Sequence, residues 1–117
     1  MLDPNVHLIA TIRFLSTAEG GRLHPAFCGY RGQFYYDGHD WDASYIFSSD
    51  PVYPGEIMEA MIFLISPDMH VGKLHRNKGF EVREGAQVVA HGMITWVHPD
   101  LIGEPAGPIT PEIPAIL

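Results

Sequence analysis

Hydrophobic and polar residues alternate along several short stretches of the chain, as they do in strands that bury one face and expose the other. The first stretch is residues 6–15, VHLIATIRFL, where every second side chain from Val6 to Phe14 is apolar. His7, Thr11 and Arg13 fall on the opposite face, which suits exposure to solvent. Five further stretches are interpreted as strands from their alternation or their β-branched and aromatic content: residues 32–37, 43–47, 56–66, 79–84 and 86–97.

The segment 56–66, EIMEAMIFLIS, fits two kinds of secondary structure. Every second position from Met58 to Leu64 is apolar, as in a strand. Apolar residues also recur there at helical spacing, and glutamate, alanine and methionine favour helices. The preceding Pro54-Gly55 turn and the strand-rich neighbouring segments favour a strand, which is the prediction.

Glycine, proline and short polar residues mark the loops between these stretches, including residues 16–25, 37–42, 48–55 and 70–78. From Pro99 onward the chain contains five prolines and two glycines in 19 residues. That composition favours an extended, polyproline-like tail over a packed element. The predicted organisation is a β-barrel domain over residues 1–98 and an extended tail over residues 99–117.

Several short strands without a secure helix argue for an all-β fold, as an antiparallel barrel or a sandwich. A chain of 117 residues suits one such domain. The N-terminus lacks the basic and long apolar regions of a secretory signal, and no apolar run approaches the roughly 20 residues of a membrane helix. We therefore expect a cytoplasmic protein with no membrane partner, and the single Cys28 agrees with a reducing compartment.

The formal net charge of the chain is −7. Because an acidic chain repels phosphate backbones, this charge counts against general nucleic-acid binding but leaves room for a local basic patch. Residues 70–78 are a candidate for such a patch, since Lys73, Arg76 and Lys78 are three of the seven lysines and arginines. The alternative is that this segment is an ordinary solvated surface loop.

Three motifs occur in order and together span about residues 6–97. The first is EGGRLHPAFCGYRGQFYY (19–36), the second is the Pro54-Gly55 turn with its apolar strand, and the third is GFEVREGAQVVAHGMITWV (79–97). As a set, they resemble the C-terminal β-barrel domain of bacterial elongation factor Tu, here standing alone. The resemblance implies a small closed six-stranded antiparallel β-barrel.

The same resemblance sets expectations for function. No GxxxxGK[ST] phosphate loop occurs in the sequence, so we expect no nucleotide cofactor and no GTPase activity. In the family, this domain contacts the T arm of aminoacyl-tRNA, the nucleotide-exchange factor and the GTPase domain. By position, Arg22, Arg31 and Gln33 match residues at or beside the tRNA-facing loops, whereas Gln87 replaces a basic residue of the closing hairpin.

Two functional hypotheses follow. The first is a non-catalytic, translation-related binding module that presents an elongation factor Tu-like surface to a protein which recognises that factor. The alternative is a module that binds tRNA or other RNA. The predicted macromolecule-binding residues are Arg22, His24, Arg31, Gln33, Lys73, Arg76 and Lys78. A competing interpretation of the two arginines is that they brace loops by binding nearby carboxylates or carbonyls.

Candidates for chemistry are weak in this sequence. Asp37, His39, Asp40 and Asp42 are metal-binding residue types, but their spacing matches no zinc or EF-hand motif. Cys28 and His24 combine a nucleophile with a base, and no third group completes the set. We therefore predict no catalytic residue, metal or cofactor. A homodimer is a further hypothesis, because the tail carries apolar residues at Ile109, Ile113, Ile116 and Leu117.

Overall fold

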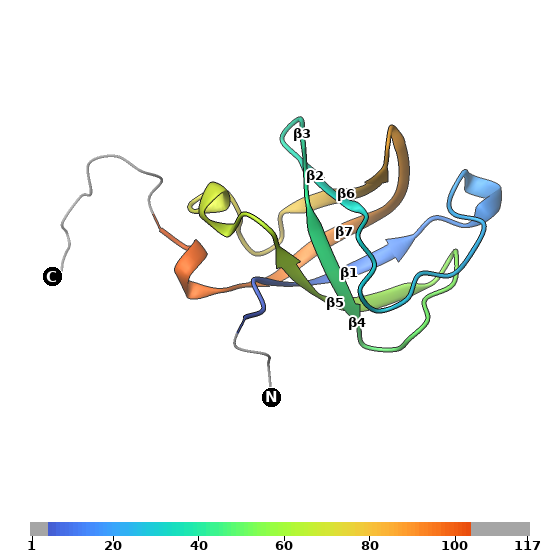
Figure 1. Ribbon diagram of the computed structural model, residues 1–117, viewed down its shortest axis with the longest axis horizontal. Helices are drawn as coiled ribbons and strands as arrows, with labels where there is room; N and C mark the ends of the chain where they lie inside the picture. The colour runs from blue at the N-terminus through green and yellow to red at the C-terminus, as the bar shows by residue number, and fades with distance from the viewer. Residues whose placement is uncertain (1–4, 104–117) are drawn as a thin grey trace, which may run out of the picture.

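The structure, a computed structural model, describes residues 5–103 and consists of one strongly curled antiparallel sheet (Figure 1). In space its strands follow the order β3-β2-β6-β7-β1-β5-β4. The bounds are β1 Leu8–Phe14, β2 Gln33–Tyr36, β3 His39–Trp41, β4 Ala43–Phe47, β5 Ile57–Leu64, β6 Gly79–Glu84 and β7 Gln87–Val97. Three short 3-10 helices lie between or after the strands: η1 Thr17–Glu19, η2 Pro67–His70 and η3 Pro99–Leu101.

The predicted all-β fold is confirmed, and each of the six predicted strands is present. The ambiguous segment around residues 56–66 forms β5, in which Ala60, Ile62 and Leu64 are buried. In β1 the four alternate side chains from Leu8 to Phe14 are buried as predicted. Among the described residues, no helix is long and apolar enough to cross a membrane.

The prediction of a closed six-stranded barrel is wrong, because the sheet has seven strands and stays open. The extra strand, β3, occupies part of the segment interpreted as a turn. Asp37 and Gly38 both take positive φ, at 49° and 84°, which is the conformation of a tight two-residue hairpin turn. The chain therefore returns at once from β2 and pairs β3 against it.

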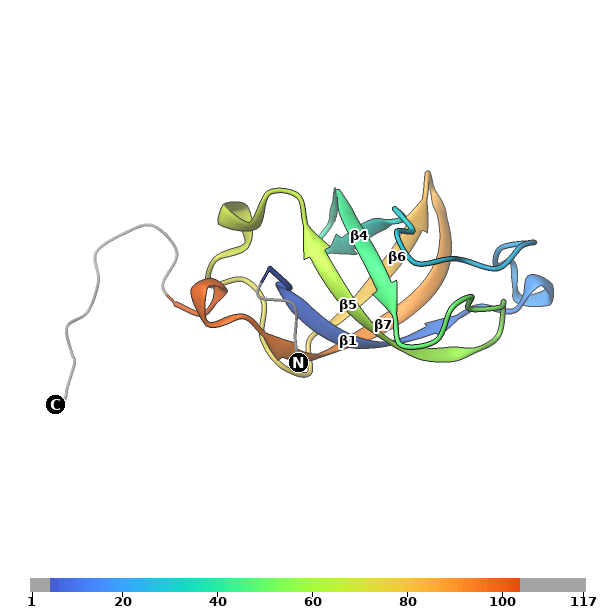
Figure 2. The same cartoon turned by 60° about the horizontal axis from the view of Figure 1, so that its bottom comes forward.

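The two edges of the sheet meet at a single residue. β3 and β4 form opposite edges, yet only Asp42 separates them in the chain. The Asp42 carboxylate accepts a hydrogen bond from the Gln33 amide at 3.0 Å, and its carbonyl accepts one from the Ile65 N–H at 3.2 Å. Asp42 thus ties one edge to the other and imposes the half-barrel curvature visible in Figure 2.

The rest of the seam is bridged by the segment that precedes β2. Isolated antiparallel bridges join Ala26 to Val52 and Tyr30 to Tyr45. In the second bridge, the Gly29 N–H donates to the Tyr45 carbonyl at 2.8 Å and the Tyr45 N–H donates to the Tyr30 carbonyl at 3.0 Å. Residues 26–30 therefore lie along β4 and the loop that follows it, without forming a regular strand.

A buried histidine lies where the sequence indicated a polar surface loop. His70, at the end of η2, is fully buried, and its Nδ1 lies 2.6 Å from the Tyr36 hydroxyl. The Trp41 ring packs edge-on against the His70 ring, with centroids 4.6 Å apart. The Nε2 atom of His70 has no hydrogen-bond partner among residues 5–103. Burial, with smaller contributions from Lys73 and His7, lowers the pKa of His70 to about 4.

The chain remains packed a short way beyond the predicted boundary at residue 98. Leu101 in η3 is buried, and its carbonyl accepts a hydrogen bond from the Gly72 N–H at 2.9 Å. The remainder of the predicted tail, residues 104–117, lies outside the described residues, as do the apolar side chains proposed to mediate a homodimer.

The close contact at Gly92 gives a test of the packing. Gly92 on β7 pairs with Phe80 on β6, and a Cβ at Gly92 would lie 2.2 Å from the Phe80 ring. Phe80 has little room to move, because it packs against Phe34 with ring centroids 4.5 Å apart. We expect Gly92→Ala to lower the free energy of unfolding by about 1–3 kcal/mol, measured by urea denaturation. Gly79→Ala is the control, since the nearest atom there is 3.8 Å away; equal losses in both variants would contradict this account.

His70 gives a second test, through pH. Below about pH 6.5 the unfolded chain protonates His70, whereas the folded chain does so only near pH 4. Stability should therefore fall as the pH drops from about 6.5 to about 4, with a contribution from this residue of up to about 1.4 kcal/mol per pH unit. We expect His70→Gln to flatten the measured curve of unfolding free energy against pH. The exposed-site variant His24→Gln should keep the wild-type slope, and identical slopes in all three proteins would refute the assignment to His70.

Candidate binding surface

The loop with the EGGR motif begins from a firmly capped turn. The Ser16 hydroxyl accepts a hydrogen bond from the Glu19 N–H at 3.1 Å, and the Glu19 carboxylate accepts one from the Ser16 N–H at 2.8 Å. This capping box fixes η1. The Glu19 carboxylate also pairs with Arg13 on β1 at 3.2 Å, and these contacts lower the pKa of Glu19. The loop is thus attached to the sheet at its start.

Arg22 is the internal brace of this loop. Its guanidinium pairs with the Glu84 carboxylate and donates to the carbonyls of His24, at 3.1 Å, and Pro25, at 3.4 Å. It also lies over the Tyr30 ring, 5.0 Å from the centroid, and the Tyr30 hydroxyl donates to the same Glu84 carboxylate at 2.5 Å. Burial, and then the neighbouring Glu84, raise the pKa of Tyr30. Arg22 therefore holds two loops together, as the competing interpretation of the arginines predicted.

Gln87 completes this brace from β7. Its amide donates to the carbonyl of Gly20 at 2.6 Å and more weakly to that of Gly21 at 3.4 Å. Gln87 thus secures the glycine pair, Gly20 and Gly21. Between these groups lies a hollow of about 270 Å³, lined by Gly21, Arg22, Leu23, His24, Glu84 and Gln87.

The other predicted binding residues divide into engaged and free side chains. Gln33 donates to Asp42, and the Lys78 ammonium pairs with Asp37 at 3.1 Å while lying 5.5 Å from the centroid of the Tyr36 ring. Arg31, Lys73 and Arg76 are exposed and form no ion pair with any residue of the described range 5–103.

The seven predicted residues do not form one patch. The loop after η1 lies at one end of the half-barrel, and the loop after η2, which carries Lys73, Arg76 and Lys78, lies near the other end (Figures 1 and 2). The structure thus separates the two groups that the RNA hypothesis combined. Of the seven lysines and arginines, four are neutralised by carboxylates: Arg13, Arg22, Lys78 and Arg83.

The loop after η1, held by Arg22 and Gln87, is called the braced loop below. Three apolar side chains are exposed on or beside it, and the sequence analysis missed them. Leu23, Phe27 and Tyr53 are 76%, 57% and 53% exposed. The bridge between Ala26 and Val52 buries these two residues, and because side chains alternate along an extended chain, it turns their neighbours outward. We call Leu23, Phe27 and Tyr53 the apolar rim. Its signal in the sequence was three large apolar side chains within segments that otherwise resemble polar loops.

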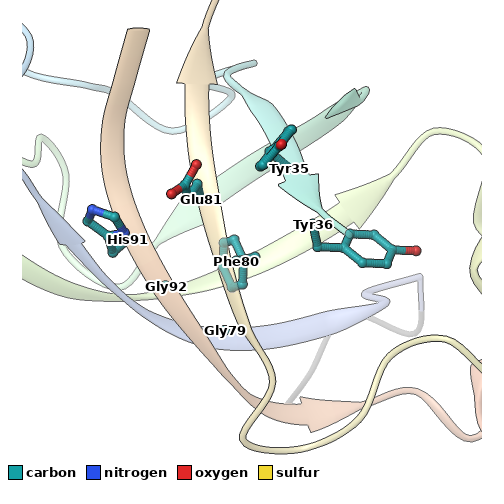
Figure 3. Close-up of a pocket in the computed structure, with 7 residues that line it drawn as sticks. All are labelled: Tyr35, Tyr36, Gly79, Phe80, Glu81, His91 and Gly92. Atoms are coloured by element: carbon teal, nitrogen blue, oxygen red, sulfur yellow. The ribbon is translucent and has the colours of Figure 1, made fainter. Parts of the chain in front are cut away.

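A second hollow, of about 370 Å³, lies on β2, β6 and β7 and is shown in Figure 3. Its floor is a cross-strand row in which Tyr35 pairs with Glu81 and Glu81 pairs with His91. The Arg83 guanidinium lies over the Tyr35 ring, 4.1 Å from the centroid, and pairs with Asp40. Glu81 and His91 form no hydrogen bond or ion pair with each other. The geometry of this hollow therefore favours a reaction centre less than the geometry of the braced loop favours binding.

The candidate groups for chemistry are engaged elsewhere. The Cys28 thiol lies 3.3 Å from the Phe47 N–H, which donates to it, and so faces the main chain of β4. Of the four clustered metal-binding residue types, Asp37 and Asp40 face Lys78 and Arg83. Within residues 5–103, no group of three or more histidine, cysteine, aspartate or glutamate side chains is arranged to hold a metal ion.

A scan against models of known protein families finds none that matches this chain. The likeness to the C-terminal domain of elongation factor Tu therefore remains an interpretation of the three sequence motifs.

The bracing role of Arg22 can be separated from a binding role by one matched pair of substitutions. We expect Arg22→Gln to lower the free energy of unfolding by about 1–2 kcal/mol, because it removes the cationic partner of Glu84 and the donor to two loop carbonyls. Arg31→Gln, at an exposed position without an ion pair, should change it by less than about 0.5 kcal/mol. Urea denaturation measures both values. An Arg22→Gln variant as stable as the wild type would show that Arg22 does not brace the loop and is free to contact a partner.

Proposed function

We propose that this protein is a non-catalytic binding module that contacts another protein through the apolar rim of Leu23, Phe27 and Tyr53. The observation that carries the proposal is that three apolar side chains are exposed on two joined loops. Leu23 and Phe27 belong to the segment braced by Arg22, Glu84 and Gln87, and Tyr53 follows Val52, which the Ala26–Val52 bridge joins to that segment. Large apolar and aromatic side chains that are exposed together are typical of protein-binding sites.

The bracing supports binding because it lowers the cost of ordering the loop. A loop that is fixed before it meets its partner loses little conformational freedom on association. Here the capping box at Ser16, the hydrogen bonds from Gln87 and the two isolated bridges fix both sides of the rim. The rim is therefore presented in one arrangement, as recognition of a specific partner requires.

Charge favours a protein partner over RNA. An RNA-binding surface needs lysines and arginines that are free to neutralise phosphates. Near the apolar rim, Arg22 is committed to Glu84, which leaves Arg31 as the exposed cation of that loop. RNA binding through the predicted set would have to use side chains at both ends of the molecule. We therefore expect weak tRNA binding that salt abolishes.

The motifs shared with elongation factor Tu suggest which proteins to test. In the resembled family, this domain contacts the nucleotide-exchange factor and the GTPase domain, so both, purified, are the probes. We expect the full chain to bind at least one of them in a calorimetric titration. The double variant Leu23→Ser/Phe27→Ser should weaken binding at least tenfold, because it removes the two most exposed side chains of the rim.

Met93→Ser is the matched control, since Met93 is 51% exposed on β7 and lies outside the rim. It should bind like the wild type. Gel shifts with tRNA, using the wild type and Arg31→Gln, test the alternative. Tight tRNA binding that is insensitive to the rim substitutions, or failure of both protein probes to bind, would overturn the proposal.

A further inference from the structure

Each aromatic side chain of the apolar rim has a carboxylate fixed beside it. The Cys28 N–H, next to Phe27 in the chain, donates to the Asp50 carboxylate at 3.0 Å. The Tyr53 N–H donates to the Glu56 carboxylate at 2.9 Å. These backbone hydrogen bonds hold two exposed anions against the rim, and neither carboxylate forms an ion pair with any residue that the structure describes.

Phe27 and Tyr53 face the same side of the two joined loops. The antiparallel bridge between Ala26 and Val52 buries both of these residues, so the residues that follow each of them point outward. Residues placed diagonally across an antiparallel pair lie about 7–8 Å apart, which aromatic and long side chains can span. A cation that lies over one of the two rings is therefore also close to the other.

The same chain shows what such groups do when a cation is present. Three times, a cation lies over a tyrosine ring and pairs with a carboxylate beside that ring. The three sets are Arg22 with Tyr30 and Glu84, Lys78 with Tyr36 and Asp37, and Arg83 with Tyr35 and Asp40.

The rim contains such a set without its cation. At Tyr53 the ring is 53% exposed and its carboxylate, Glu56, is in place. Among residues 5–103, no lysine or arginine lies over this ring or over that of Phe27. The arrangement that the chain completes from its own residues at three other tyrosines is left incomplete at the rim.

We infer that the partner of the apolar rim supplies the missing cation, as an arginine side chain that lies against the two rings and pairs with the two fixed carboxylates. This inference rests on the proposed function and adds the chemistry of the partner to it. A guanidinium stacks on aromatic faces and binds carboxylates in a planar, two-pronged manner, so arginine suits the combination better than lysine. The attraction strengthens when the partner excludes water from the contact.

The surroundings of the rim agree with a partner segment that is both basic and apolar. The formal net charge of −7 attracts cations toward the chain. Arg31, the exposed cation of the braced loop, forms no ion pair with Asp50 or Glu56, so both anions are available to a partner. Leu23, which is 76% exposed, offers an apolar contact beside them. The matching segment therefore carries an arginine flanked by apolar side chains.

Two peptides that differ only in charge test the inference on the full chain. The probes are the amidated, acetylated peptide Gly-Leu-Arg-Leu-Gly and the same peptide with citrulline, which has nearly the shape of arginine without its charge. In NMR titrations of the ¹⁵N-labelled protein, we expect the arginine peptide to shift the amide signals of Cys28 and Tyr53, because these N–H groups donate to the two carboxylates. The citrulline peptide should bind at least tenfold more weakly.

Neutral variants assign the preference to the two carboxylates. Asp50→Asn and Glu56→Gln each keep an oxygen that accepts the backbone hydrogen bond and remove the negative charge. The double variant should therefore lose the tenfold preference for the arginine peptide. The control Asp68→Asn/Glu81→Gln removes the same charge from η2 and β6 and should keep the preference.

Three results would overturn the inference: no binding of the arginine peptide, equal binding of the two peptides by the wild type, or an unchanged preference in Asp50→Asn/Glu56→Gln. The proposed function is decided separately by the calorimetric titrations with the two protein probes. A protein probe that binds through the rim, together with equal binding of the two peptides, would leave the proposed function standing and reject the arginine.

Discussion

The structure depends on one covalent constraint, which is that a single residue, Asp42, connects the two edges of the sheet. Because β3 and β4 lie at opposite edges and are consecutive in the chain, the sheet has to curl until those edges meet at that point. Hydrogen bonds from Gln33 and Ile65 to Asp42 hold the junction. Away from it the edges diverge, and the segment 26–30 bridges the gap, which places the braced loop and the apolar rim at one end of the half-barrel.

The residues with the strongest motif signal proved to be structural. Arg22 and Gln87 support the loop from within, and the side chains exposed beside them are apolar. An arginine that is ion-paired and stacked on an aromatic ring is a poor phosphate ligand but an effective brace. Polar and charged residues therefore fix the shape of the loop, and apolar residues form the surface exposed beside it.

Local pattern was enough to predict six strands, because alternation depends on neighbours two residues apart. It was not enough for β3, whose three residues, His39 to Trp41, carry no apolar alternation. This strand forms only because a tight turn returns the chain to pair with β2. Nor could local pattern place His70 in the core, since its burial depends on Tyr36 and Trp41, far away in the chain. The role of Arg22 likewise depends on Glu84, 62 residues later.

The same geometry determines which backbone groups the two edges of the sheet expose. A sheet that fails to close leaves two edges with backbone groups able to pair with another chain, which is the usual route to edge-to-edge aggregation. Here one edge is only three residues long and carries the charged Asp40, and the other is partly covered by residues 26–30. Neither edge of this open sheet therefore presents a long, flat and unpaired row of backbone groups to another chain.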